Sequence, residues 1–362
     1  MKKCNRLPVL IIMCIAFFTA TAQITVVASG LSGPYGLAFD QTTNRLYVSQ
    51  SADALNYKVS YIILNTTEPQ IVDLLSTNII KPTRLKISND SYLYVVESDP
   101  NMGKISRANI SGTDTPQITP YITGGLVTPM GLDLKNGNLY IGDFGNYAIK
   151  KLTPQGSSFQ TTLLRNDLAS DLIIDGNIYY YSNPYYGVFS NSITNPSPVS
   201  TQITTGISNP SSLLLNGDWL FISDSQNGSV YRVNLYTGSS SAQLLITGLN
   251  QPQSMVVYNN ELYIAESGAN RIVKFDLNSL NTKKFESNLI VTISPNPAND
   301  KLNIQTESDI KDISVYDILG KKVSINLISV NQIDLTRLLN GLYFIKITAE
   351  NNAVFLTKFI KN

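Results

Sequence analysis

The stretch 251-QPQSMVVYNNELYIAESGANRIVKFDL-277 decides the architecture that we expect for this chain. Alternating apolar residues from Ser254 to Tyr258 and from Glu261 to Ala265 predict two strands around the turn Asn259-Asn260. The segment from Arg271 to Leu277 predicts a third strand. The same order of turn, apolar stretch and Leu-Tyr-Ile-like triplet occurs six times at intervals of 39 to 47 residues, and this period is typical of a four-stranded propeller blade. We therefore expect an all-β fold built on a six-bladed β-propeller. The triplets are Leu46-Tyr47-Val48, Leu93-Tyr94-Val95, Leu139-Tyr140-Ile141, Ile178-Tyr179-Tyr180, Leu220-Phe221-Ile222 and Leu262-Tyr263-Ile264.

The first five repeats continue into a fourth alternating strand, and the sixth does not. After Leu277 the chain is polar from Asn278 to Asn288. The segment Gln23 to Ser29, followed by Gly30-Leu31, is similar to the ends of the other fourth strands. We expect it to complete the last blade, because sharing a blade between both ends of the domain closes the ring and removes open strand edges. The expected fourth strands are Gln70–Leu75, Gln117–Thr123, Phe159–Leu164, Val199–Thr204 and Gln243–Thr247.

Two repeats carry a family resemblance. Residues 251–277 and 128-TPMGLDLKNGNLYIGDFGNYAIKKL-152 resemble the NHL repeat, with a Pro-x-Gly opening, a Gly-Asn-Leu-Tyr-Ile centre, an acid and a closing Ile-x-Lys-hydrophobic strand. The resemblance covers Gln23 to Leu280 and is weakest in blade four, where Ala169-Ser170-Asp171 replaces Pro-x-Gly. It implies an NHL-like or TolB-like propeller, distantly similar to streptogramin lyases and gluconolactonases. Such propellers include protein-binding and RNA-binding modules as well as enzymes, so the fold alone does not select a function.

The first 22 residues have the pattern of a secretory signal peptide. Basic residues precede an apolar run from Val9 to Phe18, and Ala20-Thr21-Ala22 provides a small-residue cleavage site before Gln23. The apolar run is too short to span a membrane, so we expect no membrane insertion. Cleavage removes Lys2, Lys3 and Arg6 and takes the formal charge from +1 to −2. No basic field for nucleic acid is then expected.

Cleavage would also remove both cysteines, Cys4 and Cys14. The mature chain would then have no disulfide and no thiolate. Lipid attachment at Cys14 is disfavoured, because Met13 stands where a small residue is expected.

The repeats stop near Leu289, and the remaining segment predicts a small Ig-like β-sandwich of short alternating strands. Spaced motifs in it resemble the type A C-terminal sorting domain of the bacterial type IX secretion system. This resemblance implies the type IX secretion machinery as a partner, and export to the outer-membrane surface or the medium. An ordinary adhesion-like module is the alternative. The expected domains are a signal peptide (1–22), the propeller (23–280), a linker (281–288) and the sorting domain (289–362). The motifs are Ser294-Pro295-Asn296-Pro297, Val315 to Lys321, Ile333-Asp334-Leu335, Asn340-Gly341-Leu342-Tyr343 and Lys358-Phe359-Ile360-Lys361; the expected strands are Lys301–Gln305, Asp312–Ile318, Lys321–Asn326, Leu342–Thr348 and Ala353–Ile360.

The chain contains no histidine, which excludes a Ser-His-Asp triad and an imidazole metal ligand. This absence disfavours a streptogramin-lyase activity, because that family relies on a histidine base. The related gluconolactonases bind a divalent metal near the starts of the inner strands. Here those starts offer only Asp171 as a carboxylate, too few oxygen ligands for a hard cation. We expect no metal and no other cofactor. The residues after the six inner-strand openings are Tyr35, Thr83, Met130, Ser170, Ser211 and Gln253.

Carboxylates recur two residues after the triplets. Glu97, Asp143, Asp224 and Glu266 occupy this place in four repeats, while Gln50 and Ser182 occupy it in blades one and four. Alternating chain direction places them at one mouth of the channel. Two interpretations compete: a ring of acids that collects a cation or a polyhydroxyl ligand, or acids that accept backbone N–H bonds from their own turns. Their repetition favours the structural interpretation.

Other ligand-binding candidates lie in the same loops. Tyr185 and Tyr186 could stack on a sugar ring or on an apolar patch of a partner, although packing on a neighbouring blade is the more common use of such residues. Arg84 replaces the glycine of blades one and three, so we expect it to point into the channel or to pair with Glu97 or Asp143. Tyr35 follows the first opening proline and is a further candidate.

These observations favour a binding module for an extracellular glycan or protein over an enzyme. The alternative is a histidine-independent lyase or a lactonase-like hydrolase that works with carboxylates. A third hypothesis is a structural coat protein. A binding module predicts ligand retention that is lost in a Tyr185→Ala/Tyr186→Ala variant, whereas an enzyme predicts turnover that is abolished by a change such as Asp143→Asn.

Overall fold

The structure is a computed structural model that describes residues 24–53, 56–64, 66, 69–112, 116–195, 197, 199–236, 241–280, 291–318, 320–350 and 354–362. The predicted signal peptide with Cys4 and Cys14, its cleavage site and the predicted linker lie outside the described residues. Within the described ranges, no helix is long and apolar enough to cross a membrane. The chain divides into two compact units, one ending at Asn278 and one starting at Ser279.

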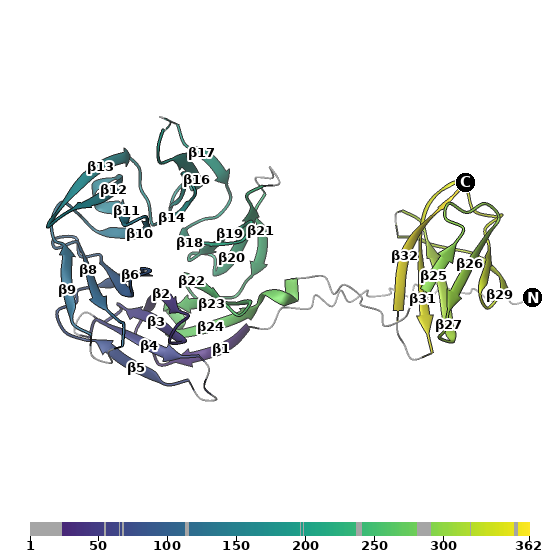
Figure 1. Cartoon of the computed structure of the whole chain (residues 1–362), viewed down its shortest axis with the longest axis horizontal. Coiled ribbons are helices and arrows are strands. Elements are labelled where there is room, and N and C mark those ends of the chain that lie inside the picture. Colours follow the sequence, from purple (N-terminus) through teal and green to yellow (C-terminus); the bar gives the residue numbers. More distant parts are fainter. Residues whose placement is uncertain are drawn as a thin grey trace, which may run out of the picture. The chain divides into compact units, whose positions relative to one another are not determined.

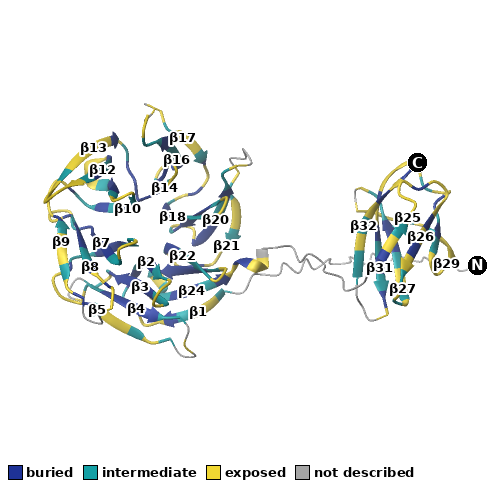
Figure 2. Ribbon diagram, in the orientation of Figure 1, coloured by how far each residue is buried: buried dark blue, intermediate teal, exposed yellow. Residues whose placement is uncertain are grey.

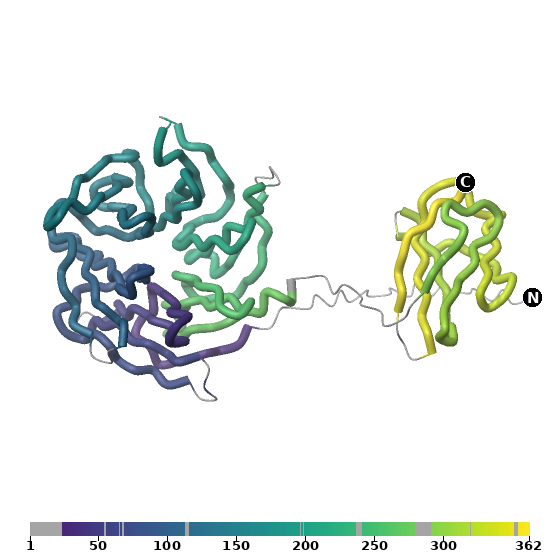
Figure 3. The backbone as a smooth tube through the Cα atoms, in the orientation of Figure 1, coloured from purple at the N-terminus to yellow at the C-terminus, as the bar shows by residue number. Residues whose placement is uncertain are grey.

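The first unit is a ring of four-stranded antiparallel sheets (Figure 1). The described strands form six such sheets, which we call blades one to six in chain order. The innermost strands of successive blades contact each other in a closed cycle that returns from β22 to β2. The tube in Figure 3 follows this path from the purple blade one to the green blade six.

Each blade orders its strands from the channel outward. Blade one is β2 (Pro34–Asp40), β3 (Arg45–Gln50), β4 (Lys58–Ile63) and β5 (Ile71–Leu75). Blade two is β6 (Pro82–Ile87), β7 (Tyr92–Glu97), β8 (Lys104–Asn109) and β9 (Ile118–Ile122). Blade three is β10 (Pro129–Lys135), β11 (Asn138–Asp143), β12 (Ala148–Gln155) and β13 (Ser158–Arg165). Blade four is β14 (Asp171–Asp175), β15 (Ile178–Asn183), β16 (Gly187–Ser192) and β17 (Thr201–Thr204). Blade five is β18 (Pro210–Asn216), β19 (Trp219–Asp224), β20 (Ser229–Asn234) and β21 (Gln243–Ile246). Blade six is β22 (Pro252–Tyr258), β23 (Glu261–Glu266), β24 (Arg271–Asp276) and β1 (Ile24–Ser29).

Blade six takes its outer strand from the start of the described chain. Strand β1 pairs antiparallel with β24, with Ile24 opposite Phe275 and Ser29 opposite Arg271. The backbone N–H of Leu31 also donates to the carbonyl of Asn270 at 3.1 Å. The first and the last strand of the propeller sequence therefore pair within one sheet, as the sequence predicts. This pairing covers the edge of β24 that would otherwise be open.

The hydrophobic core lies between the blades. The leucine of the triplet is almost fully buried in the five blades that have one, and inner strands are mostly buried while outer strands are mostly half-buried or exposed (Figure 2). One cluster, for example, joins Tyr47 and Val59 of blade one to Leu93 and Val95 of blade two. Each blade thus buries both faces of its inner strands against its neighbours, which explains why these strands read as nearly continuous apolar runs.

In blade four the repeat pattern is shifted by one residue relative to the prediction. Strand β15 pairs Asp171 with Ser182, whereas β11 pairs Gly131 with Gly142. Asp171 therefore occupies the place of Gly131, and Asn183 the place of Asp143. The triplet of this blade is Tyr179-Tyr180-Tyr181 and not Ile178-Tyr179-Tyr180, and the position of the recurring acid is Asn183 and not Ser182. Three consecutive tyrosines fit the pattern in either register, so the triplet could not decide it.

The second unit is a β-sandwich. Its two four-stranded sheets share one hydrophobic cluster that includes Leu302 and Ile333 from one sheet and Ile345 and Phe359 from the other. The predicted strand Lys321–Asn326 corresponds to two separate short strands, Lys322–Val323 and Asn326–Ser329, and two strands of this unit, Val291–Ser294 and Gln332–Asp334, lay outside the prediction. The first sheet is β25 (Val291–Ser294), β26 (Lys301–Thr306), β30 (Gln332–Asp334) and β29 (Asn326–Ser329); the second is β28 (Lys322–Val323), β27 (Ile310–Tyr316), β31 (Gly341–Ala349) and β32 (Val354–Lys361).

Candidate ligand site at the mouth of the channel

A cavity of about 470 Å³ opens at one end of the propeller channel. We call it the vestibule. Its walls come from two kinds of loop, those that lead into the inner strands and those that join the second and third strands of a blade. Its lining residues are Tyr35, Met130, Phe144, Ser170, Pro184, Tyr185, Ser208, Asn209, Ser211, Ser225, Gln226 and Gln253.

The start of each inner strand directs one side chain to this mouth. In five blades the pairing between inner and second strand is irregular just after the opening proline, as between Pro129 and Gly131. The residue after the opening position lines the vestibule in five blades. In blade two that residue is Thr83, which instead contacts Ser98 and the carbonyl of Val96. This one position of the repeat therefore supplies five of the twelve described residues that line the vestibule.

Among the described residues that line the vestibule, none is acidic or basic. Burial raises the pKa of the Tyr35 phenol, with Arg84 opposing that rise, so Tyr35 keeps its hydroxyl proton at neutral pH. Within the described part of the chain, the side-chain amides of Asn209 and Gln226 have no hydrogen-bond partner. The vestibule thus combines aromatic rings with neutral donors and acceptors that are free to bind a ligand.

The aromatic loop of blade four is held by Asn183. Its Oδ1 accepts the backbone N–H groups of Tyr185 at 3.0 Å and of Tyr186 at 3.2 Å. The side chain of Tyr185 is 72% exposed and lines the vestibule. Tyr186 is similarly exposed but is not among the lining residues, and its ring lies 6.4 Å from that of Tyr185, edge to face. The turn therefore presents one tyrosine ring to the vestibule on a fixed backbone.

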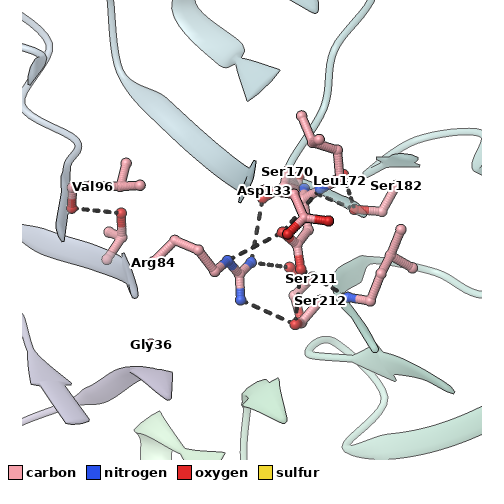
Figure 4. Close-up of polar contacts among 12 residues, drawn as sticks. Gly36, Arg84, Val96, Asp133, Ser170, Leu172, Ser182, Ser211 and Ser212 are labelled. Carbon is pink, nitrogen blue, oxygen red and sulfur yellow. Dashed lines mark hydrogen bonds and ion pairs between the residues drawn. The ribbon is translucent and has the colours of Figure 1, made fainter. Parts of the chain in front are cut away.

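A buried ion pair lies beneath the vestibule (Figure 4). Arg84 extends from blade two to blades four and five, where its Nε is 3.2 Å from Oδ1 of Asp171. Its guanidinium also donates to the hydroxyl of Ser212 and to the carbonyl of Ser211, each at 3.0 Å. Its Cζ lies 6.0 Å from the ring centre of Tyr35. Arg84 thus points into the channel but pairs with Asp171, and the expected pairing with Glu97 or Asp143 is wrong.

Asp171 is buried, yet its carboxylate is well supplied with donors. Its Oδ2 accepts the N–H of Leu213 at 2.9 Å and the hydroxyl of Ser212 at 3.0 Å, and its Oδ1 accepts the N–H of Leu172 at 2.9 Å. Burial raises its pKa, and the charge of Arg84 opposes that rise. The pair links three blades across the ring.

At the level of this ion pair, glycines in blades one and three allow neighbouring inner strands to pack closely. A Cβ at Gly36 would lie 2.0 Å from the carbonyl oxygen of Thr83, and one at Gly131 would lie 3.0 Å from Cα of Asp171. The inner strands therefore approach each other closely at this level. Blades two and four carry charged side chains here, Arg84 and Asp171, whose charges are opposite. On the far side of the pair lies a second cavity of about 260 Å³, lined mainly by inner-strand residues such as Leu37 and Met255 and by the pair itself.

The four recurring acids lie within the blades and not in the vestibule wall. Glu97, Asp143, Asp224 and Glu266 are all 0% exposed. Each accepts a backbone N–H from the loop that leads into the inner strand of its own blade, as Val127 donates to Asp143 at 2.7 Å. Their remaining bonds are side-chain contacts and, in Asp224, N–H groups of its own turn. These contacts fix the loops on which the vestibule is built.

Basic partners accompany three of these acids. Glu97 pairs with Lys104, Asp143 with Lys150 and Glu266 with Arg271. In blade four the charge sits instead on Asp167, which accepts from Tyr181 at 2.7 Å and from Asn183 at 2.9 Å. Over the described ranges, no group of three or more His, Cys, Asp or Glu side chains is placed to hold a metal ion.

Sequence reasoning found some of these residues and missed others. Tyr35 and Tyr185 were candidates and line the vestibule. Phe144, Asn209 and Gln226 were not named. Their signal was available, because Phe144 and Gln226 lie in the same second-to-third-strand loops as Tyr185. The Arg84–Asp171 pair also left a signal, since both residues replace the glycine of the repeat and their charges are opposite.

Comparisons with known proteins support the two units separately. Residues 292–362 match the family described as the secretion system C-terminal sorting domain. No curated protein matches the chain in sequence.

Two solved structures are similar in fold. One is the PQQ-bound form of an aldose sugar dehydrogenase from Streptomyces coelicolor, at 15% identity and a TM-score of 0.56, over 71% of this chain and 98% of that chain. The other is a gluconolactonase from Xanthomonas campestris, at 14% identity and a TM-score of 0.56, over 70% of this chain and 89% of that chain. At these identities the similarity establishes the fold alone.

The match to the tail assigns an export route. The chain carries a type IX sorting tail. Such a tail is recognised by the type IX secretion machinery and directs the protein to the cell surface or the medium. The propeller is therefore the exported cargo of this tail.

Proposed function

We propose that the propeller is an extracellular binding module whose vestibule takes a neutral glycan. The observation that carries this proposal is the wall of the vestibule: none of its described lining residues is charged, and three of them are aromatic, namely Tyr35, Phe144 and Tyr185. The other lining residues are mostly hydroxyls and amides.

The chemistry of this wall suits a sugar. A sugar ring has an apolar face that stacks on an aromatic ring, and hydroxyls that both donate and accept hydrogen bonds. The free amides of Asn209 and Gln226 and the protonated phenol of Tyr35 can satisfy such hydroxyls. A charged ligand would lose its hydration without a counter-charge, because Arg84, the cation beneath the vestibule, is already paired with Asp171.

The volume fits a short segment of a glycan. About 470 Å³ lies within the range of small-molecule sites, which is roughly 300 to 1,000 Å³. Tyr186 is 69% exposed beside Tyr185 and would extend the stacking surface beyond the vestibule. We propose that the mouth holds one or two sugar units and that the rest of the glycan lies across the exposed loops.

The same proposal includes the route to the outside. Residues 1–22 would act as a signal peptide cleaved between Ala22 and Gln23, and residues 281–288 would link the propeller to the sorting tail. The mature propeller would then meet glycans of the surroundings or of the cell surface.

The test compares two exposed tyrosines. Tyr185 is 72% exposed at the vestibule, and Tyr236 is 71% exposed after the third strand of blade five, where alternating chain direction places it at the opposite mouth. Tyr185→Ala should weaken the binding of an array-selected neutral oligosaccharide by about 3- to 10-fold, since aromatic stacking contributes roughly 0.5–1.5 kcal/mol. Tyr236→Ala should leave the affinity unchanged. Both variants should keep the unfolding midpoint of the parent.

Three results would count against this function. Retention of protein ligands only would favour a protein-binding module. Turnover of a lactone or a polysaccharide that Asp143→Asn abolishes would favour the enzyme alternative. Equal loss of affinity in the Tyr185 and Tyr236 variants would move the site away from the vestibule.

A further inference from the structure

The two sheets of the sorting domain have different outer faces. In the sheet of β28, β27, β31 and β32, alternate residues of β31 point away from the core, namely Leu342, Phe344 and Lys346, while Tyr343, Ile345 and Ile347 are buried. Residues directly opposite on neighbouring strands lie on the same face. The pairing of β31 with β32 and β27 therefore defines the rest of this face.

The outer face of this sheet is apolar and basic. Leu342 lies opposite Ile360, Phe344 opposite Lys358, and Lys346 opposite Leu356. On the other side of β31, Phe344 lies opposite Tyr316, which is opposite Lys322. Lys346 lies opposite Ser314, and Thr348 lies between Val354 and Asp312, so this end of the outer face is more polar and carries one acid. The exposed fractions of the apolar side chains are 37% for Leu342, 37% for Phe344, 53% for Leu356 and 44% for Ile360. We call this surface the apolar-basic face; its members are Tyr316, Lys322, Leu342, Phe344, Lys346, Leu356, Lys358 and Ile360.

The outer face of the other sheet is polar. The residues that alternate with its buried Leu302 and Ile304 and their cross-strand partners carry only polar side chains. Three exposed apolar residues of this unit, Leu327, Ile328 and Val330, lie on or beside the edge strand β29. The polar outer face consists of Thr292, Ser294, Lys301, Asn303, Gln305, Gln332 and Asp334.

The free edge of β32 is covered near its end. Asn296 accepts the N–H of Ile360 at 3.0 Å through Oδ1 and donates to the carbonyl of Lys358 at 3.3 Å. The N–H of Ala298 donates to the carbonyl of Ile360 at 2.7 Å, and that of Asn362 to the carbonyl of Ala298 at 2.9 Å. The Ser294 to Pro297 motif thus occupies the hydrogen-bonding groups that strand addition would need here. A partner can still reach the side chains of the face.

We propose that the apolar-basic face is the surface by which the type IX export machinery recognises this tail. The occupant is a protein component of that machinery with an apolar patch bordered by acidic side chains. Exposed apolar residues in such a group mark interaction sites, and Lys322, Lys346 and Lys358 set the complementary charge. The tail motifs around Gly341 and Phe359 supply Leu342, Lys358 and Ile360 to this face. The proposal rests on the sorting-domain match and not on the ligand of the propeller.

Export of the full chain from a host with a type IX secretion system tests this proposal. Phe344→Gln/Leu356→Gln removes apolar area, and Lys322→Glu/Lys358→Glu reverses charge without touching the core. Each pair should reduce the released protein by about tenfold or more, as expected for residues near the centre of an interface, with tail-bearing chain accumulating in the periplasm. Ile328→Gln/Val330→Gln removes similarly exposed apolar residues elsewhere on the unit and should be released normally.

Melting of the purified full chains separates recognition from folding. If both face variants melt like the parent and are released at the parental level, the proposal is wrong. A release defect in the Ile328→Gln/Val330→Gln control alone would place recognition at the β29 edge and would also overturn it. A monomer–dimer equilibrium of the parent that the face variants abolish, with export unchanged, would assign the face to a second copy of the chain.

Discussion

Replacement of Arg84 by methionine isolates the ion pair beneath the vestibule. Methionine fills much of the same volume, so the change mainly removes the charge and its hydrogen bonds. Arg84 and Asp171 are both 3% exposed, and their atoms approach to 3.2 Å. The variant leaves a buried carboxylate without its cation. This situation typically costs 3–5 kcal/mol.

Three hydrogen-bond donors to Asp171 place the expected loss of stability at the lower end of this range. Leu172, Leu213 and Ser212 still hold the carboxylate in the variant, so we expect a loss of about 3 kcal/mol. Asp171→Asn should cost a similar amount, because it leaves Arg84 buried and unpaired. Arg84→Met/Asp171→Asn should lose only about 1–2 kcal/mol, because no unpaired charge remains. These losses predict that the double-mutant cycle reports a coupling of about 4–5 kcal/mol.

Urea unfolding followed by tryptophan fluorescence provides the assay. The chain has a single tryptophan, Trp219, in β19 of the propeller, so the signal reports this unit and not the sorting domain. Additive single-variant losses, with coupling below about 0.5 kcal/mol, would refute the role of the pair.

The pH dependence gives a second check with a defined sign. Burial raises the pKa of Asp171, and Arg84 opposes that rise. Without Arg84 the pKa of Asp171 rises further, so the folded variant binds this proton more tightly than the unfolded chain does. The stability of the variant relative to the parent should then increase as the pH falls through the folded pKa of Asp171 in the variant, until it reaches the lower folded pKa of Asp171 in the parent. A difference in the free energy of unfolding between parent and variant that widens on acidification would contradict this account.

Two further predictions concern the ring and the recurring acids. Deleting residues 24–29 should lower the free energy of unfolding of the propeller by at least about 3 kcal/mol, because it removes the β1 to β24 hydrogen bonds and opens the edge of β24; an unchanged Trp219 unfolding curve would contradict the closure. Glu97→Gln should destabilise the propeller by about 1–3 kcal/mol, because Glu97 is fully buried and accepts from Ile80 and Ser106. Its affinity for an array-selected oligosaccharide should stay at the parental value, and a loss of affinity without a loss of stability would favour a direct ligand role.

Much of the fold could be predicted because the blades share a repeated sequence pattern. The spacing of the triplets and the missing fourth strand of blade six predicted the closing pairing of β1 with β24. The same repetition failed at Tyr179-Tyr180-Tyr181, where alternation allows two registers and only the pairing of Asp171 with Ser182 selects one. Within this strand Tyr180 faces away from Tyr179 and Tyr181 and lies in a different core cluster, as the alternation of side chains in a strand requires.

The site was harder to predict, because it depends on distances across the ring. Arg84 and Asp171 come from blades two and four, and nothing local links them in sequence. The repeated position of the acids suggested a ring of carboxylates at the channel mouth. A buried carboxylate that accepts backbone N–H groups within its own blade also repeats once per blade, so the repetition did not distinguish the two roles. The vestibule wall instead uses positions whose residue type changes from blade to blade. Such variation gives no periodic signal.

A structure of the protein soaked with an array-selected neutral oligosaccharide tests the central claim most directly. We expect a sugar ring against Tyr185, with its hydroxyls bonded to the side chains of Asn209 and Gln226 and to the phenol of Tyr35. Sugar bound instead in the cavity beyond the Arg84–Asp171 pair, or on the outer surface of the blades with the vestibule unoccupied, would contradict the account.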